Sequence, residues 1–367
     1  MSTRLHELRD HGQSPWLDYI ARDFIHDGEL AGLIRDGIVG LTSNPTIFQG
    51  AIAGGNAYDD QLREVLKTET DPKEVFLALA REDVREACDQ LREVFERGES
   101  TRDGWVSLEV DPNFAHDTEA TIKEARRLFD MIERPNLFVK IPGTKEGLKA
   151  IEETIAAGIP VNVTLLFSLE RHRAAAQAYL QGLRRLREAG GDLSTVASVA
   201  SFFVSRVDTE ADRRLDEIGG HDELKGKLAI ANAKLAYQTY KELFSGSEWV
   251  ELEAVGASPQ RCLWASTSTK NPEYRDVIYV EELIGPSTVN TMPRETIEDF
   301  MDHGRVDDTL ERGVDEARRT LEQFAEAGID YDDVVAVLER EGVEKFAKSF
   351  KELIDGVAAK RDELVAA

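Results

Sequence analysis

The sequence predicts an α/β fold in which a parallel sheet closes into a barrel. Short apolar runs alternate with longer amphipathic segments almost from end to end of the 367 residues. This alternation is the pattern of repeated strand-helix units. The apolar runs number eight, the strand count of a closed barrel of this kind. We therefore expect a single (β/α)8 TIM-type barrel with extra C-terminal helices.

The eight predicted strands are short, and most contain branched or aromatic side chains. In chain order they are Trp16–Ala21, Ile38–Thr42, Trp105–Val110, Leu137–Ile141, Val161–Phe167, Val196–Val204, Cys262–Ser266 and Val277–Ile284. Longer segments between them have apolar residues at three- and four-residue spacing, which is typical of helices packed on one face. Examples are Pro72–Arg97, Thr118–Ile132, Lys145–Ala157, Leu169–Glu188 and Leu224–Phe244.

An open doubly wound sheet would also hold many strands. Its dinucleotide-binding version has little support, because no Gly-x-Gly-x-x-Gly follows the first strand. The loose cluster of Gly50, Gly54 and Gly55 is better interpreted as a turn.

The chain is long for one domain, but barrels often exceed about 250 residues as a single unit. We expect one catalytic domain over residues 1–367, with 1–13 as an N-terminal extension and about 295–367 as terminal helices packed on the barrel. After Arg294 the sequence is helical and acidic. An apolar stripe in this region indicates a packed helix, although a partner-binding helix would show the same stripe. The stripe consists of Val343, Phe346, Phe350, Leu353 and Val357.

Composition limits the partners. The 70 acidic and 45 basic side chains give a formal charge of -25, so the average field repels nucleic acid and anionic membranes. An anionic substrate must therefore meet a local basic pocket. Cys88 and Cys262 are far apart and lie in no metal-binding motif, which favours a reducing cytoplasm. The start of the chain has no apolar signal core, and no apolar stretch approaches about 18 residues. The expected partners are small molecules.

Lys140 is the first candidate for chemistry, because working residues of such barrels project from the C-terminal ends of the strands. It is the only cation in the apolar run Asn136–Pro142. A lysine held in a desolvated interior gives up its proton more readily, and its free amine can attack a carbonyl to form a Schiff base. The alternative is a strand-end lysine whose flexible stem reaches solvent.

Glu109 and Asp18 are acids within apolar strands. Either one alone could bond to a neighbouring loop or point outward by strand alternation. Together with Lys140 they suggest more, because Schiff-base catalysis needs proton transfers at the carbinolamine and at the leaving alkoxide. Carboxyl groups in different environments can divide those two tasks.

Three further positions have both a structural and a functional interpretation. Asn44 lies in the segment Leu41–Phe48, where Ser43, Asn44 and Pro45 could simply start a helix. Arg206 could form a surface ion pair with Asp208, and Lys270 could be a solvated loop lysine. In an acidic protein, however, two cations after successive late strands suggest a phosphate site.

These segments together resemble transaldolase in its longer bacterial form, from about residue 12 to at least residue 303. Six motifs occur in the family's order, each on a different predicted strand. They are Gln13–Asp18, Leu41–Phe48, Ser107–Pro112, Leu137–Pro142, Asn162–Ser168 and Leu263–Pro293.

The resemblance implies a Schiff-base transferase that moves a dihydroxyacetone unit between sugar phosphates, with no metal and no organic cofactor. Lys140 would be the Schiff-base lysine, and Glu109 and Thr164 would position a water that relays protons. Asp18 would take the proton from the C4 hydroxyl as the C3–C4 bond breaks. The residues matching the dihydroxyacetone site are Thr42, Asn44, Asn162 and Ser201, and those matching the phosphate end are Arg206, Ser266 and Lys270.

Two positions depart from the shorter members of the family. Lys270 stands where those enzymes have arginine, which replaces a bidentate fork by a point charge. Phe202–Arg206 lacks the proline and glycine usual in this turn. The resemblance specifies neither a homodimer nor a monomer.

Two alternative functions remain at this stage. A Schiff-base aldolase of the fructose 6-phosphate type would need the same lysine, but the related aldolases are shorter and have tyrosine where this chain has Glu109. A non-catalytic sugar-phosphate-binding barrel would explain Arg206 and Lys270. It gives Lys140, Glu109 and Asp18 no common role.

Overall fold

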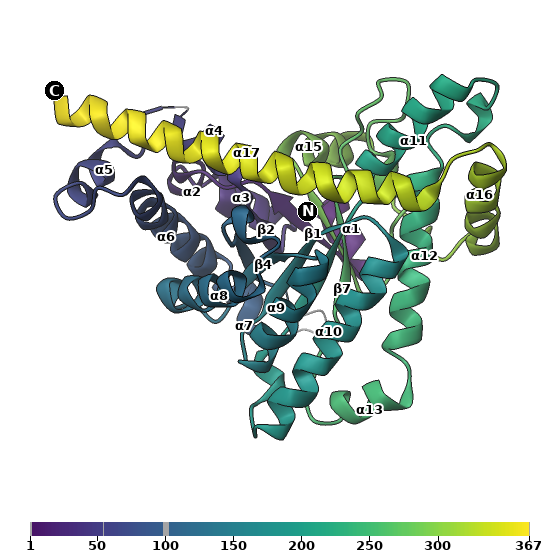
Figure 1. The fold of residues 1–367 in the computed structure, drawn as a ribbon, viewed down its shortest axis with the longest axis horizontal. Helices are drawn as coiled ribbons and strands as arrows, with labels where there is room; N and C mark the ends of the chain where they lie inside the picture. Colours follow the sequence, from purple (N-terminus) through teal and green to yellow (C-terminus); the bar gives the residue numbers. More distant parts are fainter. Residues whose placement is uncertain (1, 54, 98–102, 367) are drawn as a thin grey trace.

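The computed structural model describes the whole chain except residues 1, 54, 98–102 and 367. Its described residues form a closed barrel of parallel strands in the order β1 to β8, surrounded by helices (Figure 1). The predicted fold class is therefore confirmed. The strands are β1 Gln13–Asp18, β2 Gly40–Thr42, β3 Trp105–Glu109, β4 Leu137–Pro142, β5 Val161–Leu166, β6 Ser198–Phe203, β7 Arg261–Ala265 and β8 Thr288–Met292.

The register of the strands brings polar residues side by side at one end of the barrel. Lys140 on β4 is level with Glu109 on β3 and with Asn162 on β5. Asp18 is level with Thr42 in the same way. Because all strands are parallel, these positions share the C-terminal rim, where barrel enzymes carry their active sites.

The eighth strand was predicted wrongly. The run Val277–Ile284 contains the short helix α14 Ile278–Glu281, and the last strand is β8, a few residues later. Val277, Val280 and Ile284 are fully buried and recur at helical spacing, so the apolar character of this run belongs to one helical face. Strand β8 contains buried polar residues such as Asn290, which accepts a hydrogen bond from Thr267 Oγ1 at 2.9 Å. A strand with buried polar residues is not recognised when strands are predicted from apolar runs.

The first strand begins three residues earlier than predicted, at Gln13. Gln13 and Ser14 are buried but hydrogen-bonded: Gln13 Nε2 donates to Leu283 O at 2.6 Å, and Ser14 Oγ donates to Asp103 at 2.7 Å. Because the Gln13 amide nitrogen and the Ser14 hydroxyl have these partners, the strand tolerates both residues in its interior.

The helices expected between the strands are present, and α8 Thr118–Ile132 and α10 Leu169–Glu188 have the predicted bounds. Asp117 and Ser168 begin them by accepting hydrogen bonds from first-turn amides. The predicted helix Pro72–Arg97 is divided into α6 Pro72–Gln90 and α7 Arg92–Glu96. Instead of the predicted helix Leu224–Phe244, the structure has a short 3-10 helix, η3 Asp222–Leu224, followed by α12 Leu228–Leu243. The others are α1 Arg4–Asp10, α2 Arg22–His26, α3 Glu29–Asp36, α4 Pro45–Ala53, α5 Asp59–Val65, η1 Pro112–Phe114, α9 Lys145–Ala156, η2 Leu193–Thr195, α11 Ser205–Ile218, α13 Ser247–Glu253, α15 Arg294–His303, α16 Val314–Glu326 and α17 Tyr331–Ala366.

The glycine cluster is not a single turn. Gly50 lies within α4, which contradicts the prediction for this residue. Gly55 lies in a bend after the helix, and Gly54 is outside the described residues.

The last helix, α17, crosses the C-terminal end of the barrel. Figure 1 shows it in yellow, running from the side of α16 and α11 to the side of α4 and α5. Phe346, Phe350, Leu353 and Val357 of the predicted stripe are buried, and Val343 packs against the core. The stripe therefore packs within the molecule.

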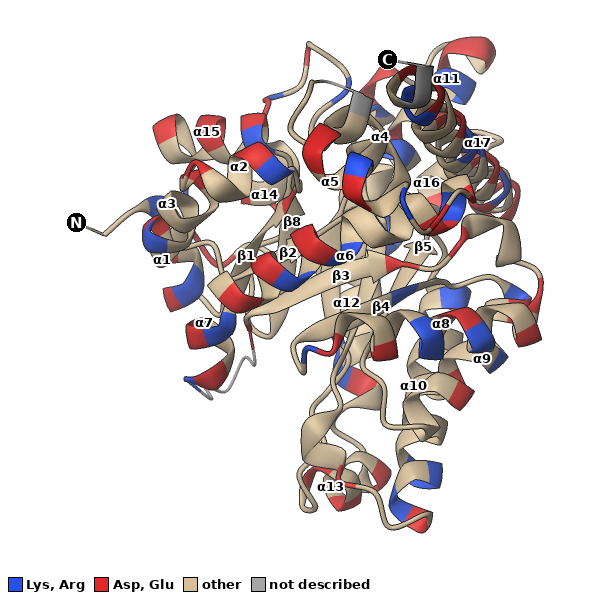
Figure 2. Ribbon diagram, turned by 90° about the vertical axis from the view of Figure 1, so that its left-hand side faces the viewer, with Lys and Arg blue, Asp and Glu red and all other residues tan. Residues whose placement is uncertain are grey.

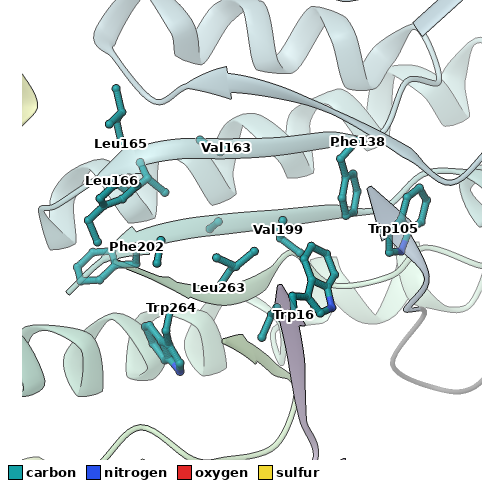
Figure 3. Packing of buried hydrophobic residues seen from close by; sticks show 14 of the residues in the cluster. Trp16, Trp105, Phe138, Val163, Leu165, Leu166, Val199, Phe202, Leu263 and Trp264 are labelled. Carbon is teal, nitrogen blue, oxygen red and sulfur yellow. The ribbon is translucent and has the colours of Figure 1, made fainter. Parts of the chain in front are cut away.

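Aromatic residues fill the barrel near the opposite end. Phe138 stacks on Trp105 with ring centroids 4.2 Å apart, and Trp16 lies 6.2 Å from Phe138 (Figure 3). Beside them the buried Arg261 donates to Ser14 Oγ and to Asp103, each within 3 Å. This end is thus closed by packed rings and a buried ion pair.

Charged residues of both signs lie mostly on the outer helices, whereas the strands are largely uncharged (Figure 2). No helix in the described part of the chain has the combination of length and apolar character that crossing a membrane requires.

Candidate active site

A cavity of about 230 Å³ opens at the C-terminal end of the strands. Most of the site residues predicted from the sequence line this cavity. Glu109 and Asn162 do not line the cavity themselves, but they contact Lys140 and Ser201, which do. The predicted residues in the wall are Asp18, Thr42, Asn44, Lys140, Thr164, Ser201, Arg206, Ser266 and Lys270.

Lys140 points into the cavity and is only 5% exposed. Its Nζ donates to the carbonyl of Ser43 at 3.1 Å and lies 3.3 Å from Glu109 Oε2. The ring of Phe346, from α17, lies 5.6 Å from Nζ. The lysine therefore does not reach solvent, and the interpretation of it as an ordinary strand-end lysine does not hold.

Glu109 is a buried acid next to this amine. Burial raises its pKa to about 7, because loss of water disfavours the carboxylate more than the Lys140 charge favours it. Neither of its carboxylate oxygens has a hydrogen-bond partner of good geometry among the described residues, nor has the buried hydroxyl of Thr164. Both side chains thus have free donor or acceptor capacity close to Lys140.

Asp18 is the second buried acid. Its Oδ1 accepts a hydrogen bond from Thr42 Oγ1 at 2.6 Å, and the hydroxyl of Thr291 lies 2.7 Å from the same Thr42 oxygen. Burial raises the pKa of Asp18, while the charge of Lys140 and the Thr42 hydrogen bond oppose this effect. The hydroxyls of Thr42 and Thr291 therefore hold one carboxylate oxygen of Asp18 in place. Because its pKa is raised, the Asp18 carboxylate is a stronger base than an exposed aspartate.

Thr291 was not identified from the sequence. It lies on β8, which had been placed in the wrong run, so the rule that strand ends carry the chemistry was applied to the wrong residues.

Three buried polar residues form a chain across β3, β5 and β6. Ser201 Oγ donates to Asn162 Oδ1 at 2.7 Å, and Asn162 Nδ2 donates to Ser107 Oγ at 3.0 Å. This chain fixes the orientation of the Asn162 amide. Asn44 both lines the cavity and caps α4, since its Oδ1 accepts from the Ile47 amide at 3.1 Å.

Arg206, on α11, lines the same cavity, and its charge interacts with that of Asp18. It has no carboxylate within 4 Å among the described residues, and its guanidinium lies 5.1 Å from the ring centroid of Phe203. Asp208 instead accepts from the Ala229 amide and from Tyr279, so the alternative of an Arg206–Asp208 ion pair is wrong.

Ser266 and Lys270 follow β7 and border the same cavity. Ser266 has a positive φ of 55°, and its hydroxyl lies 3.0 Å from that of Ser205. Lys270 is exposed, and its Nζ donates to Ser268 at 2.5 Å. A third cation, Lys345 on α17, lines this part of the cavity and was not predicted.

The described residues contain no group of three or more His, Cys, Asp and Glu side chains arranged to hold a metal ion.

The fold and the site together define a barrel enzyme whose cavity contains a buried lysine near two buried acids and is also lined by other cations. The family model for transaldolase/fructose-6-phosphate aldolase matches residues 15–357. The chain is 54% identical over 360 residues to a transaldolase of Acidothermus cellulolyticus, covering 97% of this chain and 96% of the other. It is 51% identical to a transaldolase of Thermobifida fusca, with 98% of each chain covered, and 49% identical to one of Mycolicibacterium smegmatis, with 96% and 95% covered. The chain belongs to the transaldolase/fructose-6-phosphate aldolase family.

Proposed function

We propose that this protein is a transaldolase of the pentose phosphate pathway. It moves a dihydroxyacetone unit from sedoheptulose 7-phosphate or fructose 6-phosphate to erythrose 4-phosphate or glyceraldehyde 3-phosphate. The observation that carries the proposal is the buried amine of Lys140, 3.3 Å from Glu109, in a cavity that Asp18 also lines. The named relatives support the same activity.

In the first step, the Lys140 amine attacks the ketose carbonyl and forms a carbinolamine, which loses water to give an iminium ion. Glu109, with a pKa near 7, can give and take protons at neutral pH. Its unpaired oxygens and the unpaired Thr164 hydroxyl can hold the water that carries the proton. These two residues therefore serve imine formation and hydrolysis.

In the second step, Asp18 removes the proton of the C4 hydroxyl, and the C3–C4 bond breaks. The electron pair of that bond passes to the iminium nitrogen, leaving an enamine on Lys140 and releasing the aldehyde. Thr42 holds one oxygen of Asp18 in place, and burial makes the carboxylate a better base.

The three-carbon unit stays attached to Lys140 until an acceptor aldehyde arrives, which makes the reaction a transfer with ping-pong kinetics. The residues proposed to hold its hydroxyls are Thr42, Asn44, Asn162 and Ser201, and those proposed to hold the phosphate are Arg206, Ser266 and Lys270.

Glu109 favours transfer over simple aldol cleavage, since fructose 6-phosphate aldolases resembling this chain have tyrosine at this position. The buried and free thiols of Cys88 and Cys262 agree with a cytoplasmic setting. Substrates are small sugar phosphates, and the mechanism calls on no nucleic acid, membrane or cofactor.

Borohydride trapping tests the proposal. Reduction in the presence of fructose 6-phosphate should add a stable three-carbon unit to the peptide that contains Lys140, because the glyceraldehyde 3-phosphate has departed. Lys140→Arg keeps the charge, but its guanidinium stays protonated and cannot attack, so adduct and activity should both disappear from a folded variant. An adduct on Lys145, Lys149 or Lys270, or an active arginine variant, would refute the assignment of Lys140.

A further inference from the structure

The phosphate end of the cavity contains one more cation than sequence reasoning supplied. Lys345 lies on α17, far along the chain from Arg206 and Lys270, yet all three line one cavity. The pKa of Lys345 is lowered, first by the charge of Arg206 and then by partial loss of water, although the side chain is exposed. Although the Lys270 side chain is exposed, partial loss of the water around it lowers its pKa, and the charges of Arg206 and Lys345 lower it further. The three cations are thus close enough to repel one another.

Such a cluster is unusual in this protein, which has 70 acidic side chains against 45 basic ones. Basic side chains elsewhere are commonly paired with acids. Lys348, for example, lies three positions after Lys345 on α17, and its Nζ is 3.8 Å from Glu352. In the described part of the chain, neither Arg206 nor Lys270 nor Lys345 has a carboxylate within 4 Å. Three unpaired cations around one cavity are the arrangement that an anion stabilises.

The position of Lys345 is fixed by its helix. On one side Arg214 pairs with Asp333 at 2.7 Å, and on the other Lys360 pairs with Asp59 at 2.7 Å. Between these points Phe346 is buried against the cavity, close to Lys140. Lys345, its immediate neighbour, is therefore held at the rim and is not on a free end of the chain.

We propose that Lys345 binds the phosphate group of the sugar substrates together with Arg206 and Lys270, so that α17 forms part of the substrate site. The inference rests on the proposed function, because it assumes that this end of the cavity receives phosphate. A phosphate ester carries about -1.5 to -2 charges at neutral pH. Arg206 offers a planar fork, whereas the two lysines act as mobile point charges that complete the neutralisation. Lys345 would thereby favour phosphorylated over plain ketoses.

The test compares Lys345→Met with the matched control Lys348→Met, which removes the same charge from the outer side of the same helix. KM for fructose 6-phosphate and the inhibition constant of inorganic phosphate should each rise about 10-fold in Lys345→Met. The constants for fructose as donor should change far less. Lys345→Arg should restore most of the phosphate binding, and Lys348→Met should resemble the wild type.

The outcomes separate this inference from the proposed function. If the wild-type protein shows no transfer activity, the proposed function is refuted. An active wild type in which Lys345→Met matches Lys348→Met for both constants would refute only the role of Lys345. Equal losses with fructose and fructose 6-phosphate would also refute it, because they would assign the residue to the shape of the cavity. Arg206→Ala serves as the reference for loss of phosphate binding.

Discussion

At the scale of single residues, the site contains two acids in different surroundings. Glu109 lies beside Lys140 and has no other hydrogen-bond partner in the described part of the chain, whereas Asp18 is held by Thr42. Both pKa values are raised because burial disfavours a carboxylate. Two acids that differ in their contacts can serve different proton transfers, one at the nitrogen and one at the C4 oxygen.

This division predicts the behaviour of Asp18→Asn. The amide cannot remove the C4 proton, so the Schiff base should form on Lys140 while C3–C4 cleavage slows about 10²- to 10⁴-fold. Borohydride reduction followed by mass spectrometry should then find the intact six-carbon phosphate on the Lys140 peptide. The wild type should retain only three carbons. A three-carbon adduct formed by the variant at the wild-type rate would show that another base acts.

At the scale of elements, Asp208 joins three helices, α11, α12 and α14. It lies on α11, and its carboxylate accepts from the Ala229 amide of α12 at 2.7 Å and from Tyr279 of α14 at 2.8 Å. Burial raises its pKa to about 7. Asp208 therefore connects α11, which also carries Arg206, to α12 and α14.

A raised pKa gives a definite sign to the pH dependence of stability. The folded protein holds the Asp208 proton more tightly than the unfolded chain does. The stabilisation is complete below the ordinary value of 3.8 and is lost as the pH rises through about 7. Asp208→Asn lacks this dependence, so its free energy of unfolding relative to wild type should increase by roughly 1–3 kcal/mol between pH 4 and pH 8. Urea unfolding of both proteins across this range measures the difference. A constant difference would contradict the prediction.

At the scale of the whole molecule, the two ends of the barrel have separate tasks. The C-terminal end holds the cavity, and the opposite end holds the aromatic cluster and the Arg261–Asp103 pair at 2.9 Å. In barrels of this type, residues at the N-terminal end serve stability. Arg261 also reaches Ser14, so the pair joins β7, β1 and the segment before β3.

Arg261→Met should therefore affect stability without changing the chemistry. It leaves the buried Asp103 carboxylate unpaired, which costs about 3–5 kcal/mol. The double variant Asp103→Asn, Arg261→Met removes the unpaired charge and should recover part of this loss. Both can be measured by urea unfolding, with kcat of the folded fraction expected to stay within about twofold because the site is at the other end. A large fall in kcat would show that the two ends are coupled.

Sequence reasoning was most successful where one local pattern determines the structure. Short apolar runs between amphipathic segments located seven of the eight strands. Glu109 and Lys140 were both predicted at strand ends, and the parallel register of the structure places them side by side. Prediction from the sequence failed at β8, where buried polar residues such as Asn290 and Thr291 contact partners distant in sequence, and Thr291 was missed with it. Sequence reasoning did not predict Lys345 as a site residue for a different reason. An apolar stripe predicts that a helix packs but does not specify its partner, and only the path of α17 brings this lysine to the cavity.

The position of α17 at the end of the chain also determines the order in which the parts of the cavity are synthesised. All eight strands lie before residue 293, whereas α17 begins at Tyr331. Every strand that carries Lys140, Glu109 or Asp18 is therefore synthesised before α17. Until that helix has been made, the part of the cavity wall that Lys345 and Phe346 contribute is missing.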